Sequence, residues 1–472
     1  MTPTSSPASK PSLYPIPQPR GLPLVGNLFQ MPPRALVQYF TKLATRFSGA
    51  FNISFVGHLV TFTYTPEIVA ELADANRFRK QVGPPLSMLR KLAGDGLFTA
   101  HTSEPNWGSA HRILVAGFGQ RAMRTYFDAM LDVSNQLVAK WQGASEQDID
   151  VTADMTRLTF DTIALCGFGY RFNSFASEKS HPFIDAMNSA LAESMLRLTR
   201  IKMPFVGPRT RSRNKKFEAN IALMNQLVDE VIVARRQAQS NETCALATTN
   251  DLLNLMLQSK DPKTGEALSD LNMRYQVITF LIAGHETTSG LLSFAIYYLL
   301  KDPSLMLAAT KEADSVISKN APSFESLAEL DIIDRVIKET LRLWPTAPLY
   351  AVSPFEDTVI GGKFAIKKDH RINVLLTALH QDATIWTNPT AFDVDRFLPE
   401  REALIPAHAY KPFGNGERAC IGRQFAITEA KLALALILSR FTLEDEFNYT
   451  LKINETLTLK PEGFRIRVKP RM

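Results

Sequence analysis

One cysteine in a glycine-rich loop has the clearest capacity for chemistry. Phe413, Gly416 and Arg418 precede Cys420, and Gly422 follows it at the predicted start of a helix. Glycines allow tight turns, and the N–H groups of a starting helix favour a thiolate over a thiol. Such a thiolate is an electron-rich ligand for iron, with an aromatic ring to shield it and an arginine to neutralise an acidic group of a cofactor. A cysteine alone is more often an inert buried residue, so the prediction depends on its neighbours.

A second motif, Ala283-Gly284-His285-Glu286-Thr287-Thr288, lies midway along the longest predicted helix. Glycine and threonine weaken a helix, and threonine hydroxyls bond back to the preceding turn, so we expect a local opening there. An acid beside a hydroxyl suits proton delivery. From these residues alone, a hydrogen-bonded patch on a buried helix is an equally good interpretation.

Two weaker patterns accompany these motifs. Glu339 and Arg342 share one face of a predicted helix, and Arg396 follows in a loop-rich stretch. Trp107 and His111 lie four apart after a predicted helix start. In isolation, the first pattern is typical of a surface ion pair and the second of a core tryptophan beside a surface histidine.

Together the motifs resemble the cytochrome P450 family of haem-thiolate monooxygenases. The run F-x-x-G-x-R-x-C-x-G is similar to its haem-binding signature, A-G-x-E-T-T to its oxygen-activation motif, and E-x-x-R with a later arginine to its structural triad. The resemblance implies haem b on Cys420, protons supplied through Thr287 and Glu286, and a non-catalytic triad. It also implies residues that shape the haem loop or bind the haem propionates, namely Phe413, Gly422, Arg418, Trp107, Lys80 and His111, the last replacing a common arginine.

Within the family, the chain most resembles the haem domains of self-sufficient fatty-acid hydroxylases. This resemblance implies hydroxylation of fatty acids or similar apolar chains at subterminal positions. The expected distal pocket is apolar and consists of Phe98, Ala283, Ala347 and Leu457. At the channel mouth, His58 and Phe62 stand where bacterial members place an arginine and a tyrosine that bind the carboxylate, which removes a fixed charge and a hydroxyl.

The resemblance also implies an electron donor. FMN, FAD and NADPH would act through a flavoprotein reductase, either a separate partner or a C-terminal domain missing from this chain. A basic surface of Arg112, Arg121, Arg124 and Arg423 could meet an acidic flavoprotein, or could simply be solvated. Two other functions stay open: an H2O2-using peroxygenase, and a haem-thiolate binding or sensor protein without turnover. A zinc-ligand or nucleophile role for Cys420 lacks partner residues nearby.

Composition narrows the class of protein. The 472 residues include 53 Lys and Arg against 47 Asp and Glu, with 45% hydrophobic and 21% charged residues. This balance excludes a disordered or collagen-like chain and gives no case for nucleic acid. Three scattered cysteines favour a reducing, cytoplasmic location. The apolar run from Val277 to Leu300 carries His285 and Glu286 near its middle, so we expect a buried core helix and no transmembrane anchor.

The elements that must position these residues are mainly helical. Periodicity predicts a hairpin from Phe51 to Tyr64, a helix from Ser269-Asp270 to Asp302-Pro303, and a last helix from Gly422 to Phe441. Strand-like runs cover Thr358 to Ile366 and Arg371 to Leu379. We therefore expect an α+β, mainly α-helical fold with a long central helix and small β-sheets. A Pro/Ser-rich flexible arm, residues 1–20, would precede a single domain, residues 21–472.

Overall fold

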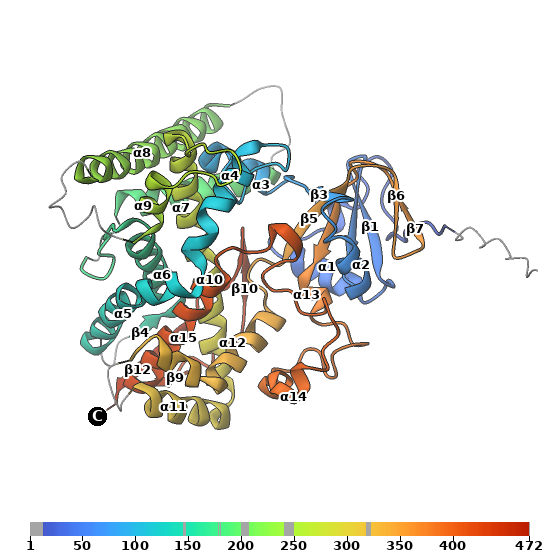
Figure 1. The fold of residues 1–472 in the computed structure, drawn as a ribbon. Helices are drawn as coiled ribbons and strands as arrows, with labels where there is room; N and C mark the ends of the chain where they lie inside the picture. The colour runs from blue at the N-terminus through green and yellow to red at the C-terminus, as the bar shows by residue number, and fades with distance from the viewer. Residues whose placement is uncertain are drawn as a thin grey trace, which may run out of the picture.

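A computed structural model describes residues 13–144, 148–177, 179, 181–199, 207–239, 250–317 and 322–471. Most of this chain is helical, as expected (Figure 1). The helices are α1 Leu36–Ala44, α2 Pro66–Glu71, α3 Leu86–Ala93, α4 Pro105–Leu114, α5 Gln120–Gly143, α6 Val151–Phe168, α7 Pro182–Thr199, α8 Pro208–Gln239, α9 Leu252–Gln258, α10 Asp270–Lys301, α11 Pro303–Ile317, α12 Asp331–Leu343, α13 Leu376–Leu379, α14 Pro399–Glu402 and α15 Arg423–Arg440.

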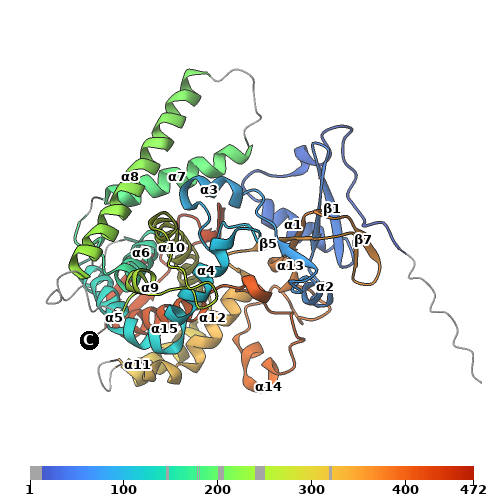
Figure 2. The same ribbon diagram turned by 45° about the horizontal axis from the view of Figure 1, so that its top comes forward.

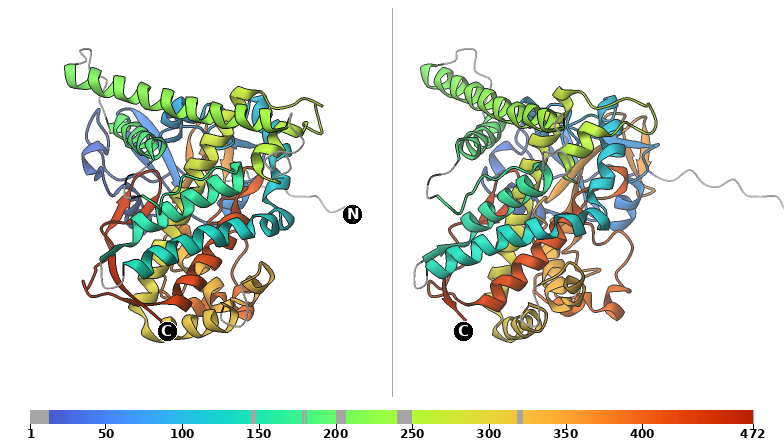
Figure 3. Two further views of the ribbon diagram at one scale, coloured as in Figure 1. Left: turned by 90° about the vertical axis from the view of Figure 1, so that its left-hand side faces the viewer. Right: turned by 60° about the vertical axis from the view of Figure 1, so that its left-hand side comes forward.

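The long central helix α10 has the predicted bounds. The Ser269 hydroxyl caps its start by accepting a hydrogen bond from Asn272 N at 3.2 Å, and Pro303 follows its last turn. Apolar residues surround the helix on most sides, so it is buried among α3, α6, α12, α15 and the strand β11 (Leu459–Pro461). Figure 3 shows α8 lying across the top of this helical part.

A five-stranded sheet forms the other end of the molecule, in the order β1-β2-β8-β5-β3 (Figures 1 and 2). The predicted hairpin is confirmed, because β1 pairs antiparallel with β2 across a turn at Val56-Gly57. The strands in this sheet are β1 Ala50–Phe55, β2 His58–Thr63, β3 Phe78–Lys80, β5 Leu349–Pro354 and β8 Ile372–Leu375. The remaining strands are β4 Asp148–Asp150, β6 Thr358–Ile360, β7 Phe364–Ile366, β9 Phe441–Glu444, β10 Ile453–Glu455, β11 and β12 Arg465–Pro470.

Two strand predictions need correction. The run from Thr358 to Ile366 is a hairpin, β6 and β7, that turns at Gly361 and Gly362, both at positive φ. The run from Arg371 to Leu379 is a strand only as far as Leu375, where α13 begins. A continuous apolar run looks alike in a buried strand and in a buried helical turn, so periodicity could not separate them.

Two hydrophobic cores support the fold. One lies among the helices around α10, and the other lies between the five-stranded sheet and α1, α2 and α13. Of the predicted arm, residues 1–12 lie outside the described residues, whereas Tyr14 N donates to Lys363 O and Asn52 N donates to Pro17 O. Across the described residues no single helix has both the length and the apolar character to cross a membrane; α10 and α11 reach both only as a pair bent by 118°.

Candidate active site

The loop before α15 is a tight turn that presents the sulfur of Cys420. Cys420 N donates to Phe413 O at 2.8 Å, which closes the loop. Gly414 and Gly416 have φ of +80° and +68°, a backbone region that other residues disfavour. A Cβ on Gly416 would also lie 3.0 Å from the carbonyl oxygen of Ala73. The glycines that the sequence singled out are therefore required by the path of the backbone.

The thiol of Cys420 is free and its side chain is exposed. Surrounding protein atoms raise its pKa, whereas the backbone N–H of Gly422 and the charge of Arg423 lower it by less. The start of α15 therefore acts in the expected direction, towards the thiolate, and desolvation acts against it. A metal cation on the sulfur would reverse this balance. Within the described ranges, no three His, Cys, Asp or Glu side chains are placed to hold a metal ion together.

Beside this loop, aromatic and cationic side chains form one cluster. The guanidinium of Arg418 lies 4.2 Å from the ring centroid of Trp107, which stacks on His111 at 5.1 Å. Arg418 Nη2 donates to Ala100 O at 2.8 Å, and Lys80 Nζ donates to Phe98 O. The structure thus brings together the four residues assigned to the propionates, from β3, α4 and the cysteine loop.

The cluster fits an anionic group. Arg418 Nη1 is buried and has no hydrogen-bond partner. Burial and the nearby Arg418 lower the pKa of Lys80 to about 7, and burial lowers the pKa of Arg418 to about 10. Two half-buried cations side by side are stabilised by a carboxylate. The residues present therefore suit the carboxylates of haem, with Cys420 as the iron ligand.

Helix α10 is continuous at Ala283–Thr288, so the predicted local opening is not observed. The hydroxyl of Thr287 donates to Ala283 O at 2.8 Å, a bond that adds to the regular helix and does not break it. Gly284 instead allows α6 to approach closely, because a Cβ there would lie 3.0 Å from Cγ1 of Ile163. Ala283 and Thr287 are half-buried on this helix.

The carboxylate of Glu286 is held by residues near the end of the chain. Its Oε2 lies 3.2 Å from Lys460 Nζ and accepts from Thr458 Oγ1 at 3.0 Å, and its Oε1 lies 3.0 Å from His285 Nε2. Burial alone would raise the pKa of Glu286, but Lys460, His285 and Thr458 together hold it well below its usual range. Sequence reasoning missed Lys460, since no spacing links it to α10.

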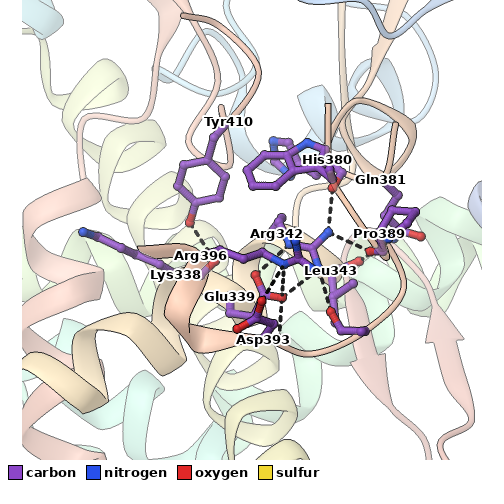
Figure 4. A network of polar contacts seen from close by, with 12 residues as sticks. Lys338, Glu339, Arg342, Leu343, His380, Gln381, Pro389, Asp393, Arg396 and Tyr410 are labelled. Carbon is purple, nitrogen blue, oxygen red and sulfur yellow. Dashed lines mark hydrogen bonds and ion pairs between the residues drawn. The ribbon is translucent and has the colours of Figure 1, made fainter. Parts of the chain in front are cut away.

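Glu339, Arg342 and Arg396 form the predicted triad, and all three are buried (Figure 4). Arg342 donates to both oxygens of Glu339 at 2.7 Å, and Arg396 Nε lies 3.3 Å from Glu339 Oε1. Arg342 also donates to the carbonyls of His380, Pro389 and Ala391 at 2.8, 2.7 and 2.9 Å. His380 Nε2 accepts from Lys411 N at 2.9 Å, so the network reaches the cysteine loop.

Three of the predicted pocket residues, Phe98, Ala283 and Leu457, are half-buried, and Ala347 is exposed. The segments of Ala347 and Leu457 are neighbours, because Leu459 N donates to Thr346 O at 3.0 Å. Both adjoin α10, since a Cβ on Gly290 would contact Leu459 and Thr346. On the other side, the segment of Phe98 meets α10 through Leu97 N, which donates to Gln276 Oε1 at 3.0 Å.

The predicted channel mouth needs correction at Phe62. This ring is 4% exposed and lies 4.4 and 5.3 Å from the rings of Phe40 and Phe51, so it belongs to the core. His58 is exposed at the start of β2. The structure therefore does not bring Phe62 to an accessible mouth with His58.

The predicted basic surface is partly neutralised. Arg112 donates to both carboxylate oxygens of Asp261 at 2.6 and 2.7 Å, and Arg124 donates to Glu325 at 2.7 Å. The side chain of Arg423 is exposed, with its guanidinium 5.7 Å from the ring of Phe413. Arg423 therefore lies beside the cysteine loop, whereas Arg112 and Arg124 are paired with acidic side chains.

Comparisons with known proteins agree with this geometry. The family model described as "Cytochrome P450" matches residues 16–468. A bifunctional cytochrome P450/NADPH–P450 reductase of Bacillus subtilis is 47% identical over 97% of this chain and 42% of its own length. The self-sufficient cytochrome P450 monooxygenase CYP505U2 of Exserohilum turcicum is 44% identical over 96% of this chain and 42% of its own length.

The fold is likewise similar to a solved structure. The crystal structure of the cytochrome P450DA heme domain has a TM-score of 0.92 and 48% identity, with 98% of each chain covered. The chain spans about 42% of the length of the curated relatives named above. The matched family model, these relatives and the cysteine loop lead to one conclusion: the chain belongs to the cytochrome P450 family.

Proposed function

We propose that this chain is a haem-thiolate monooxygenase that hydroxylates C–H bonds of fatty acids or similar apolar chains, using O2 and electrons from an NADPH-dependent flavin reductase. The observation that carries the proposal is the placement of Cys420 in a closed glycine loop beside the cations Arg418 and Lys80. A sulfur that can bind a metal, next to cations that can bind carboxylates, matches the two parts of haem that the protein must hold: the iron and the propionates. The named activities of the relatives support it.

In this proposal, Cys420 binds the iron, and Arg418, Lys80, Trp107 and His111 hold the propionates. Haem bound through a thiolate supplies the oxygen chemistry. The protein fixes its position, because the triad of Glu339, Arg342 and Arg396 holds the chain that leads to the cysteine loop. With haem bound, Phe413, whose carbonyl closes the loop, would shield the sulfur from water on the protein side.

Proton delivery is assigned to α10. The hydroxyl of Thr287 lies one residue from the ionised carboxylate of Glu286, and it can exchange its bond to Ala283 O for one to a bound ligand. Lys460 and Thr458 keep Glu286 in place and ionised, so it receives a proton from solvent only when these contacts loosen. Glu286 therefore acts as a base that Lys460 and Thr458 fix in position, next to the hydroxyl of Thr287.

The proposed class of substrate depends on the apolar side chains of the predicted distal pocket. Phe98, Ala283, Ala347 and Leu457 offer no charge to a substrate, which suits an alkyl chain. Phe62 lies in the core and has no hydroxyl, and His58 has no guanidinium, so neither offers the bidentate cation or the phenol that would fix a carboxylate. We therefore expect a subterminal hydroxylase whose preference for acids over alcohols of equal length is weak.

Electron supply would come from a flavoprotein. The relatives named above are a cytochrome P450/NADPH–P450 reductase fusion and a self-sufficient monooxygenase, which supports FMN, FAD and NADPH acting through a joined or separate reductase. Arg423 lies beside Phe413 and could meet an acidic flavoprotein surface close to the thiolate. We place the chain in the cytoplasm, as one domain over residues 21–472.

A spectral titration tests the substrate and the ligand together. The haem-loaded chain is titrated with fatty acids and with alcohols of matched length, and the products formed with a reductase and NADPH are identified. We expect similar spectral shifts for both series and subterminal alcohols as products. Cys420→Ser should lose the reduced-CO absorption typical of thiolate ligation. Products formed with H2O2 but not with the reductase would indicate a peroxygenase, and ligand binding without product would indicate a sensor.

A further inference from the structure

A buried glutamine holds the segment between α3 and Phe98 against the long helix α10. Leu97 N donates to Gln276 Oε1 at 3.0 Å, and the Gln276 side chain is fully buried. On α10, Gln276 precedes Ala283 by about two helical turns. Phe98 and Ala283 both belong to the proposed distal pocket. Gln276 therefore connects the loop that carries one pocket residue to the helix that carries another.

The hydrogen bonds of Gln276 continue in one direction as far as a carboxylate. Gln276 Nε2 donates to Asn272 Oδ1 at 3.0 Å, and Asn272 Nδ2 donates to Asp95 Oδ1 at 2.9 Å. Asp95 Oδ2 accepts from Asn106 Nδ2 on α4 at 2.6 Å. A backbone N–H can only donate and a carboxylate can only accept, so the two ends fix the orientation of each amide between them. Gln276 thus presents its oxygen, and not its nitrogen, to Leu97.

Two glycines bring this segment into direct contact with α10. A Cβ on Gly94 would overlap the ring of Tyr275, and Gly94 has φ of +44°. A Cβ on Gly96 would overlap Oγ1 of Thr279 and would lie 2.9 Å from the carbonyl oxygen of Tyr275. A larger residue at either position would therefore push the segment away from the helix. The glycines allow the close approach that the hydrogen bond from Leu97 N requires.

Two carbonyl groups beside this hydrogen bond are bound by cations that are assigned to the haem propionates. Lys80 Nζ donates to Phe98 O and lies 5.2 Å from the centroid of the Phe98 ring. Arg418 Nη2 donates to Leu97 O at 3.4 Å. Leu97 is thus held by α10 through its N–H and by Arg418 through its carbonyl oxygen. Replacing Gln276 would remove the first restraint and leave the second in place.

We propose that Gln276 is a positioning residue that determines regiochemistry, because it fixes where the Phe98 ring lies in the distal pocket. Since regiochemistry presupposes turnover, this role rests on the proposed function. A buried N–H without an acceptor is unfavourable, so the segment of Leu97 shifts when the glutamine oxygen is removed. The Phe98 ring follows its backbone, and small displacements of a pocket wall change which carbon of a bound chain can react.

Two readouts on the haem-loaded chain test this role. The first is the ratio of the subterminal alcohols that are formed from one fatty acid with a reductase and NADPH. The second is the affinity for 4-phenylimidazole relative to imidazole, measured by spectral titration, because the phenyl group needs space in the pocket that Phe98 borders. Gln276→Met keeps the length of the side chain and removes its oxygen. This variant should change the product ratio at least about threefold and the relative affinity about tenfold.

Matched variants separate positioning from a general loss of packing. Gln276→Glu offers an oxygen to Leu97 N in either protonation state, so both readouts should stay within about twofold of the parent. Ser293→Ala removes a buried hydroxyl from the same helix, which donates to Ser289 O at 2.7 Å, and should change neither readout. If Gln276→Met does not fold, Asn272→Ala replaces it. That variant removes the partner that orients Gln276, and it should change both readouts in the same direction.

The outcomes distinguish this role from the proposed function. A parent chain that forms no product with the reductase would contradict the proposed function, and the relative affinity then decides whether Gln276 positions Phe98. Gln276 has no such role if Gln276→Met folds and keeps both the product ratio and the relative affinity of the parent. The role is also refuted if Gln276→Glu or Ser293→Ala changes both readouts as much as Gln276→Met.

Discussion

Glu286 Oε2 lies 3.2 Å from Lys460 Nζ, so a charge pair joins the middle of α10 to β11 one residue before Thr287. Replacing Lys460 by methionine leaves a largely buried carboxylate with Thr458 and His285 as its partners. We expect Lys460→Met to lower the free energy of unfolding by about 2 kcal/mol, less than for a fully buried pair because both side chains keep some exposure. Denaturant unfolding measures this change.

The pH dependence of that loss has a definite sign. The folded-state pKa of Glu286 lies below its unfolded value, so the stabilisation is present above the unfolded pKa and disappears as the pH falls through the folded one. The difference between Lys460→Met and the parent should be largest near neutral pH and should shrink below about pH 4. Lys469→Met, which removes a more exposed pair with Glu444, should change little. A loss equal at all pH values would contradict the ion pair.

Two glycines at similar φ separate backbone strain from steric fit. Gly416 and Gly463 have φ of +68° and +66°, but a Cβ on Gly463 would meet no atom within 4 Å, whereas one on Gly416 would lie 3.0 Å from Ala73 O. Alanine at either position should cost about 1 kcal/mol from the backbone conformation. Gly416→Ala should cost more and weaken haem retention as well. Equal losses for both variants would show that the cysteine loop tolerates the extra carbon.

Haem uptake should depend on pH through Lys80. Burial and Arg418 lower its pKa to about 7, so above this pH the haem-free chain carries a neutral amine. A bound carboxylate favours the protonated form, and haem binding then takes up a proton. Haem affinity should therefore fall as the pH rises above about 7, by at most tenfold per pH unit. Lys80→Gln should remove this slope, and Lys91→Gln, whose pair with Glu218 is exposed, should retain it. An unchanged slope in Lys80→Gln would contradict the assignment.

The buried pair of Arg342 and Glu339 should be indispensable to the fold. Both side chains are fully buried, so removing Arg342 leaves the buried carboxylate of Glu339 with Arg396 as its remaining cation. Arg342→Met should lower the free energy of unfolding by about 3–5 kcal/mol. Lys367→Met, which breaks a solvent-exposed pair with Asp357, is the matched control and should have no measurable effect. A small loss of unfolding free energy in Arg342→Met would mean that the carbonyls bound by Arg342 can accept hydrogen bonds from other donors.

Sequence reasoning succeeded where local chemistry decides structure. The bounds of α10 follow from the Ser269 cap and from Pro303, and the cysteine loop follows from its glycines. It failed where a distant part of the chain determines the surroundings of a residue. The partner of Glu286 is 174 residues away along the sequence, and Phe62 alternates correctly for a strand but faces the core because α1 covers it. The predicted opening of α10 failed because the threonine hydroxyl satisfies a carbonyl without displacing a helical bond.

In the segment from His380 to Ala391, the hydrogen bonds of the Arg342 guanidinium all go to main-chain oxygens, and the Trp386 ring centroid lies 5.2 Å from it. Every amino acid carries such an oxygen, so these hydrogen bonds recognise the path of the segment and not its composition. Side chains other than Trp386 can consequently be exchanged there during divergence while the backbone keeps its course. An insertion or deletion in the same stretch, by contrast, would move all three acceptors and displace the loop that follows.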